Sequence, residues 1–294
     1  MHDNCSVNMA NGKWQMADGC VMRLKAAVLG SPISHSLSPA LHHAAYVALG
    51  LDIDYTAIET PTQLLAVRIA ELNQDFIGYS LTMPLKQEVL SLVAHQSLLV
   101  TQTGCANTVY RNAENQWALE NTDVFGIQQT ITQQGLGRQK LACIIGSGAT
   151  ASSALSALAN LGVREVFCYA RNQESAELLR KQSQILGIEF HYVDLGNEVV
   201  LSGDLVISTV PGTAASNIIE ALAVDQNLPP LLDIAYNPWP SELARYWESH
   251  GGGPVLSGIE MLLWQASAQV QLFTGLAAPI EAMRAALPKG LSTV

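Results

Sequence analysis

Two isolated side chains have types suited to acid–base chemistry on an alcohol. Lys86 is the only lysine between Lys25 and Lys140, so it does not belong to a solvated run of charge. Asp123 closes a short polar stretch that follows an apolar segment. A carboxylate can orient a lysine ammonium, and the amine form can accept a hydroxyl proton as hydride leaves the carbon. In the reverse direction the ammonium would polarise a carbonyl and donate the proton. A surface ion pair is the structural alternative.

A glycine-rich turn with the pattern G-x-G-x-x-A lies between an apolar run and a helical pattern. Gly146 allows a sharp turn, Gly148 lets the backbone approach a pyrophosphate, and Ala151 is small enough for close helix–strand packing. The helix N-terminus adds unpaired N–H groups and partial positive charge. Against the alternative of an ordinary turn, we predict a dinucleotide site formed by Gly146, Ser147, Gly148, Ala149 and Thr150.

The end of the next apolar run indicates which dinucleotide binds. An acidic residue there would hold a ribose 2′-hydroxyl, as in NAD sites. The sequence instead has Arg171, whose planar fork can pair with a 2′-phosphate. This favours NADP as cofactor, and a surface arginine at a strand end is the alternative.

These residues need strands and helices to bring them together. Apolar runs predict strands over 24–29, 55–58, 76–81, 105–110, 116–119, 141–145, 165–169, 190–193, 205–208 and 231–234. Helices are expected over 38–49, 62–72, 85–93, 150–161, 258–274 and 278–286, and over about ten residues after Asp123, with Ser38 as the N-cap of the first. Near-continuous apolar strands separated by helices indicate an α/β fold with a parallel sheet covered on both faces.

Length and composition exclude several classes of protein. The 294 residues suggest two domains at roughly 150 residues each. The net charge is −10 and the sequence contains no basic run, so charge would not attract a nucleic acid or an anionic membrane. We expect neither partner. No apolar run approaches the ~18 residues of a membrane helix. Residues 1–22 lack the apolar centre of a signal peptide, and we interpret them as a flexible N-terminal extension.

The cysteine and histidine patterns do not predict a metal site. The five cysteines are scattered and form no C-x-x-C pair, so neither a disulfide framework nor structural zinc is expected. Reduced thiols are typical of a cytoplasmic protein. The adjacent pair His42 and His43 has no spaced ligand partner. We therefore predict no metal and a cytoplasmic location.

Six segments, in order along nearly the whole chain, resemble the shikimate/quinate dehydrogenase family. They are residues 30–39, 82–86, 104–108, 121–126, 233–238 and 258–266. The resemblance implies that Lys86 and Asp123 are the catalytic pair. It implies substrate contacts from Ser36, Ser38, Thr82, Asn107, Tyr236 and Gln265, and it places Met261 near the nicotinamide.

The resemblance also implies an activity and an architecture. The activity is the reversible, NADPH-dependent reduction of 3-dehydroshikimate to shikimate in aromatic amino-acid biosynthesis. The partner is then a small-molecule substrate, and the protein is a monomer or homodimer. The architecture is two α/β domains with a cleft between them: a substrate domain over 23–123 and 258–294, and an inserted Rossmann-type NADP-binding domain over 124–257.

Two departures from the family pattern leave alternatives open. Ser80 stands where the family often has asparagine, and Ser175 stands where it often has a second arginine. With one arginine left to neutralise a 2′-phosphate, a quinate/shikimate or aminoshikimate dehydrogenase with relaxed NAD/NADP use is one alternative. A catalytically silent homologue that senses a metabolite or nucleotide is the other; it is expected to lack Lys86 or Asp123, and both are present.

Overall fold

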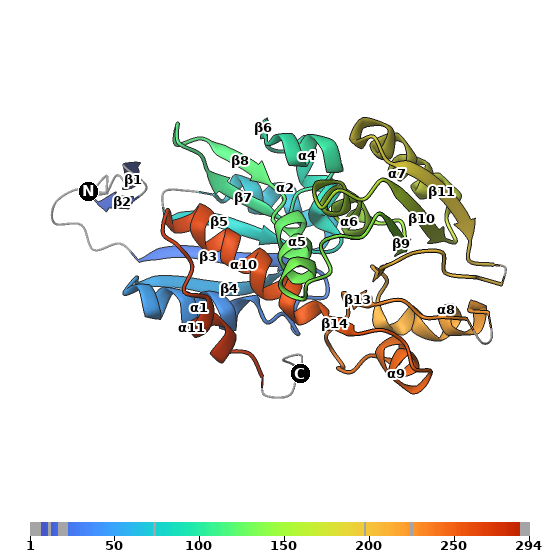
Figure 1. Cartoon of the computed structure of the whole chain (residues 1–294). Coiled ribbons are helices and arrows are strands. Elements are labelled where there is room, and N and C mark those ends of the chain that lie inside the picture. The colour runs from blue at the N-terminus through green and yellow to red at the C-terminus, as the bar shows by residue number, and fades with distance from the viewer. Residues whose placement is uncertain are drawn as a thin grey trace. The chain divides into compact units, whose positions relative to one another are not determined.

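The computed structural model describes residues 7–10, 13–16, 23–72, 75–196, 198–223 and 226–288 (Figure 1). The chain forms two compact units. Unit 1 comprises residues 1–122 and 265–287, and unit 2 comprises residues 123–264 and 288–294. Each unit contains a six-stranded sheet. Within the described ranges, no helix has both the length and the apolar character needed to cross a membrane.

Unit 2 is a doubly wound parallel sheet. Its strands run in the order β11 (Glu189–Asp194), β10 (Glu165–Ala170), β9 (Leu141–Ile145), β12 (Val206–Ser208), β13 (Leu231–Asp233) and β14 (Val255–Ser257). Every neighbouring pair is parallel. Numbered along this unit, the order is 3-2-1-4-5-6, the arrangement that binds dinucleotides where the strand order reverses. That reversal lies between β9 and β12.

Four helices connect parallel strands of unit 2: α6 (Ala149–Asn160), α7 (Gln173–Leu186), α8 (Ala215–Ala221) and α9 (Glu242–Ser249). Helix α5 (Asp123–Gln133) precedes the first strand, β9. The central strand β9 is buried at four successive residues, 142–145. This explains its uninterrupted apolar sequence, because a central parallel strand has no solvent-facing side.

Unit 1 is built on a mixed sheet. Its strands run in the order β4 (Ile53–Glu59), β3 (Leu24–Gly30), β5 (Phe76–Leu81), β7 (Thr108–Arg111), β8 (Trp117–Glu120) and β6 (His95–Gln96). Strand β3 is parallel to β4 and β5, whereas β7 is antiparallel to both β5 and β8. The helices of this unit are α1 (Ser38–Leu49), α2 (Thr62–Ala70), α3 (Leu85–Glu88), α4 (Leu98–Thr103), the second half of α10 (Gly258–Thr274) and α11 (Ile280–Ala285).

The register of unit 1 gathers four chain segments at one edge of the sheet. Ser80 near the end of β5 pairs with Thr108 at the start of β7, and Thr108 pairs with Glu120 at the end of β8. The parallel strand β3 ends at the same edge, because Leu29 pairs with Leu81. The segments that follow β3, β5 and β8 and the one that precedes β7 therefore meet there.

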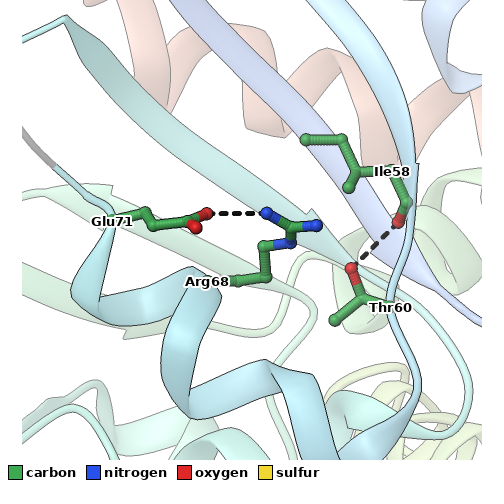
Figure 2. A network of polar contacts seen from close by, with 4 residues as sticks. All are labelled: Ile58, Thr60, Arg68 and Glu71. Carbon is green, nitrogen blue, oxygen red and sulfur yellow. Dashed lines mark hydrogen bonds and ion pairs between the residues drawn. The ribbon is translucent and has the colours of Figure 1, made fainter.

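The turn from β4 to α2 is held by polar contacts, as Figure 2 shows. The Thr60 hydroxyl donates to the carbonyl of Ile58 (3.0 Å), and the Thr60 backbone N–H donates to the carbonyl of Gly30 (2.8 Å). At the other end of α2, Arg68 pairs with the C-cap residue Glu71 at 2.8 Å. The contact with Gly30 fastens this turn to the end of β3.

Several local predictions need correction. Ser38 is the first helical residue of α1, not its N-cap; Leu37 occupies that position and makes no side-chain capping bond. The helix predicted over 85–93 ends at Glu88 and continues as a 3₁₀ turn, Val89–Ser91. The sequence patterns also gave no range for β6, α4, α7, α8, α9 and β14.

Part of the N-terminal extension has regular backbone. Strands β1 (Val7–Ala10) and β2 (Lys13–Met16) pair antiparallel. The flexible extension expected over residues 1–22 stays a prediction, and the other residues of that segment lie outside the described ranges. The domain boundaries proposed from the sequence stay predictions.

Candidate active site

The loop after β3 lies against the loop after β5 in unit 1. The Thr82 N–H donates to the Leu29 carbonyl (2.9 Å), and the Ser31 N–H donates to the Met83 carbonyl (3.0 Å). A Cβ at Gly30 would lie 2.3 Å from the Thr82 side chain. Only glycine permits this approach. It brings Thr82 beside the loop over residues 31–37, which follows β3 and is called the serine-rich loop below.

The two serines predicted to bind substrate lie together at the start of α1. The Ser38 N–H donates to the Ser36 hydroxyl oxygen (3.3 Å). Ser38 is buried and its hydroxyl hydrogen-bonds the phenol of Tyr55, whose pKa is raised by burial. Two hydroxyls at the N-terminus of a 12-residue helix suit an anion, because the helix dipole is positive there.

Lys86 and Asn107 belong to segments joined by the backbone. The Ala106 N–H donates to the carbonyl of Lys86 (2.8 Å), and the Leu81 N–H donates to the carbonyl of Asn107 (2.7 Å). Lys86 is half-buried on the short helix α3. The lysine and the amide thus come from neighbouring segments at the same sheet edge.

The Asn107 amide is held by contacts on both of its polar atoms. Its Oδ1 accepts the Thr122 backbone N–H (2.8 Å) and the Thr108 hydroxyl (2.8 Å). Its Nδ2 donates to the Thr122 hydroxyl oxygen (2.9 Å) and to Oε1 of Gln265 (3.2 Å). The structure therefore brings together two predicted substrate contacts, Asn107 and Gln265, that lie 158 positions apart in the sequence.

Asp123, Tyr236 and Met261 belong to unit 2. Asp123 follows Thr122 directly, begins α5 and is buried. Met261 is buried in the first part of α10, and Tyr236 is half-buried in the loop after β13. Lys86 belongs to unit 1, so its pairing with Asp123 stays a prediction.

The glycine-rich turn of unit 2 joins β9 to α6 at the point where the strand order reverses. Gly146 has φ +108°, and a Cβ there would lie 2.5 Å from Oγ1 of Thr209. The Thr209 hydroxyl is itself fixed, because it donates to the Ile145 carbonyl (2.9 Å). Gly148 is the N-cap of α6, and a Cβ there would meet no atom within 4 Å. The first glycine is thus required by the turn, and the second lies beside open space.

The rim of this turn offers polar side chains. The hydroxyl oxygens of Ser147 and Ser175 are 2.6 Å apart, which joins the turn to α7. Asn172 caps α7 by accepting the Ser175 N–H (3.0 Å), and the exposed Arg171 lies between that cap and the end of β10. A pyrophosphate fits the turn and the N-terminus of α6, and the guanidinium of Arg171 suits a further phosphate.

Three residues that contact or support the predicted sites were not assigned roles from the sequence. Thr122 holds the Asn107 amide, Ser175 joins the glycine-rich turn to α7, and Gln269 contacts the backbone of Asn107 (3.1 Å). For Gln269 a signal existed: it follows Gln265 by four positions, so both lie on one helix face.

Three family models match successive parts of the chain. Residues 28–109 match the model for a shikimate dehydrogenase substrate binding domain, residues 128–238 match shikimate / quinate 5-dehydrogenase, and residues 258–287 match a shikimate 5′-dehydrogenase C-terminal domain. A shikimate dehydrogenase (NADP(+)) from Prochlorococcus marinus (strain AS9601) is 30% identical over 280 residues, which cover 90% of this chain and 97% of that protein. The chain belongs to the shikimate dehydrogenase family.

Other members of the shikimate dehydrogenase family support this assignment. The enzyme named shikimate dehydrogenase (NADP(+)) from Thermosynechococcus vestitus is 32% identical over 275 residues, 90% of this chain and 95% of that protein. The crystal structure of Mycobacterium tuberculosis shikimate dehydrogenase matches with TM-score 0.79 and 38% identity, covering 90% of this chain and 98% of that one. The Thermus thermophilus enzyme in complex with NADP(H) and shikimate matches with TM-score 0.75 and 28% identity, covering 90% and 100%.

Proposed function

We propose that the protein is an NADP-dependent shikimate dehydrogenase that interconverts 3-dehydroshikimate and shikimate in aromatic amino-acid biosynthesis. The observation that carries the proposal is the Asn107–Gln265 amide pair, held at 3.2 Å on the sheet edge where the Lys86 segment also lies. Polar side chains converging at such an edge are suited to a polyhydroxylated ligand, because each hydroxyl needs a partner once water is excluded.

The acid group and the hydroxyls of the substrate would bind different parts of unit 1. Ser36 and Ser38 offer hydroxyl donors to a carboxylate at the start of α1. Asn107 and Gln265 would contact ring hydroxyls, with Thr82 lying beside the serine-rich loop. Tyr236 would line the site from unit 2. This division follows from charge, since the helix N-terminus favours the anion and the amides favour neutral hydroxyls.

Lys86 and Asp123 would share the proton of the reacting oxygen. In alcohol oxidation the amine form of Lys86 accepts the hydroxyl proton, and in ketone reduction its ammonium returns that proton. The carboxylate of Asp123 would orient the ammonium and stabilise its charge. The presence of both groups argues against a catalytically silent sensor.

Unit 2 would bind the cofactor. When bound, NADPH supplies the hydride for ketone reduction. Gly146, Ser147, Gly148, Ala149 and Thr150 form the turn and helix start that fit a pyrophosphate, and Met261 would lie near the nicotinamide. Arg171 would pair with the 2′-phosphate, which NAD lacks. The NADP preference therefore depends mainly on one exposed guanidinium.

We further propose a cytoplasmic monomer or homodimer with a small-molecule substrate. The described cysteines Cys105, Cys143 and Cys168 are buried thiols, and burial raises the pKa of Cys143 and of Cys168 to about 12. Unreactive buried thiols are compatible with a reducing compartment. Light scattering after gel filtration measures the oligomeric state.

A four-way steady-state assay tests the proposed function. Shikimate and quinate are each assayed with NADP and with NAD. We expect the highest kcat/KM for shikimate with NADP. Faster turnover of quinate with NAD would replace the proposal with the quinate/shikimate alternative, and no turnover in any combination would support the sensor.

A further inference from the structure

Asp233 is a buried carboxyl group that the proposed mechanism does not use. It is the last residue of β13 in unit 2 and is 2% exposed. Burial raises the pKa of Asp233, because it disfavours the charged form, whereas the bonds from the Ser241 hydroxyl and the Ala235 N–H oppose that shift. An apolar residue at the end of this buried strand would avoid the cost of burying a charge. What the carboxyl group adds is two hydrogen-bond acceptors on one rigid group.

The two oxygens of Asp233 bind opposite ends of one loop. The loop, residues 234–240, joins β13 to α9 and carries Tyr236. Oδ1 of Asp233 accepts the Ala235 N–H (3.3 Å), which closes an Asx turn where the chain leaves the strand. Oδ2 accepts the hydroxyl proton of Ser241 (2.5 Å), eight positions after Asp233. Tyr236 and the residues that follow it thus lie between two points that are bound to the same side chain.

Ser241 connects this contact to helix α9. It is the N-cap of α9, and its hydroxyl oxygen accepts the Ala244 N–H (2.9 Å). That bond uses a lone pair of the oxygen and leaves the hydroxyl proton for Asp233. Arg245 also holds the loop by donating to the Pro240 carbonyl (2.6 Å), but Arg245 lies on α9 itself. Of these contacts, the bond between Ser241 and Asp233 is therefore the one that ties the end of the loop to the sheet.

The start of the same loop packs against the first residue of α10. Strand β14 pairs with β13 in parallel, and α10 begins directly after β14. A Cβ at Gly258, the first residue of α10, would overlap the carbonyl of Ile234, so only glycine permits this approach. Met261 lies in the first turn of this helix. The loop that carries Tyr236 and the helix turn that carries Met261 therefore meet within unit 2.

We propose that Asp233 is a positioning residue for substrate binding: its two hydrogen bonds fix the loop over residues 234–240 and thereby hold the Tyr236 side chain where the substrate binds. This inference rests on the proposed function, since Tyr236 must contact the substrate. A connecting loop without such anchors samples many backbone conformations, and ordering it on binding lowers the affinity. The bonds to Asp233 order the loop before the substrate arrives.

The first test replaces Asp233 by leucine, which keeps the branched shape of the side chain but removes both acceptors. Wild type is assayed first with shikimate and NADP. For the Asp233→Leu variant we expect KM for shikimate to rise about tenfold, the order of one lost hydrogen bond. KM for NADP should not change, because the glycine-rich turn follows β9, which β12 separates from β13. A loss of folded protein would lower the apparent kcat and leave both KM values unchanged, so the rise in one KM separates positioning from stability.

Asp233→Asn is the conservative variant for this test. Its amide oxygen can still accept the Ala235 N–H and its nitrogen can donate to the Ser241 oxygen, so KM for shikimate should lie much closer to the wild-type value. Thermal unfolding monitors the folding of both variants. A wild-type KM for shikimate in folded Asp233→Leu would overturn the inference, as would equal rises of KM for shikimate in the two variants. An inactive wild type would instead overturn the proposed function, so the two failures are distinguishable.

The second test asks whether Asp233 acts through Tyr236. Tyr236→Phe removes only the phenol hydroxyl and should raise KM for shikimate about tenfold. If Asp233 positions this side chain, the double variant should raise KM less than the product of the two single effects. Fully multiplicative effects, or a wild-type KM in Tyr236→Phe, would contradict the inference. Tyr246→Phe is the matched control, because it makes the same substitution on α9 in the same unit and should leave KM unchanged.

Substitutions of Ser241 keep the carboxyl group and test the inference even if Asp233→Leu does not fold. Ser241→Ala removes both the cap of α9 and the bond to Asp233, whereas Ser241→Gly removes the same hydroxyl at little cost to capping. Both should raise KM for shikimate by a similar factor, although the unfolding temperature falls more in Ser241→Ala. Ser216→Ala, which breaks the bond to the exposed Glu242 (2.9 Å), is the control and should leave KM unchanged. A wild-type KM in Ser241→Gly would show that the bond to Asp233 does not position the loop.

Discussion

The buried histidine His42 predicts how the stability of the protein depends on pH. It is fully buried, stacks on Tyr55 at 4.0 Å between ring centroids, and has a pKa of about 3 because burial disfavours the charged ring. In the unfolded chain its pKa returns to about 6.5. The folded pKa of this base is the lower one, so the unfolded state takes up the proton first. The stabilisation from the neutral ring is complete above pH 6.5 and is lost as the pH falls toward 3.

The size of this effect follows from the two pKa values. At pH 5 the His42 ring is protonated only in the unfolded state. This lowers the free energy of unfolding by ~2 kcal/mol relative to neutral pH, because each pH unit below 6.5 contributes about 1.4 kcal/mol. The full separation of the two values corresponds to about 5 kcal/mol. These magnitudes apply without discount for solvent screening, because the ring is entirely buried.

Urea unfolding at pH 7.5 and pH 5.0 measures this contribution. Between pH 7.5 and pH 5.0, the free energy of unfolding of the His42→Gln variant should fall by ~2 kcal/mol less than that of the wild type. The carboxylates contribute equally to both proteins, so the difference reports on His42. His43→Gln is the matched control, since His43 is the exposed neighbour on the same helix. Equal losses in wild type and His42→Gln would refute the reasoning, as would an NMR titration that shows the His42 ring protonating above pH 5 in the folded protein.

Three substitutions test the proposed site. Lys86→Ala should lower kcat at least ~10²-fold in steady-state assays, the scale of lost acid–base help, while leaving NADP binding measured by fluorescence unchanged; near-normal rates would remove the lysine from the mechanism. Arg171→Asp should raise KM for NADP far more than KM for NAD, and equal changes would count against the 2′-phosphate assignment. Gly146→Ala should weaken NADP binding and lower the free energy of unfolding by about 1–3 kcal/mol, because φ is +108° and the new Cβ would contact the fixed Thr209 hydroxyl; wild-type NADP affinity and unfolding in urea would contradict this.

Local chemistry explains which parts of the fold were predictable. The turn at Gly146 and the stop at Gly50 follow from backbone conformations that few other residues adopt, with φ +108° and +68°. Strand β9 was recognisable from its apolar run. Ser38 shows where a local rule failed: its type and position suit an N-cap, but its hydroxyl hydrogen-bonds Tyr55 on β4. A tertiary contact replaced the local capping bond.

The sequence by itself determined the residues suited to each chemical step, the α/β class and the resemblance to a dehydrogenase family, because these depend on residue type and short-range spacing. The tertiary structure decided the sheet orders, the neutral state of His42 and the orientation of the Asn107 amide. Gln269 receives its partners from positions 161 to 227 residues away, in elements that only the folded sheet brings together. Hydrogen-bond direction and burial depend on such distant neighbours, and no short-range pattern encodes them.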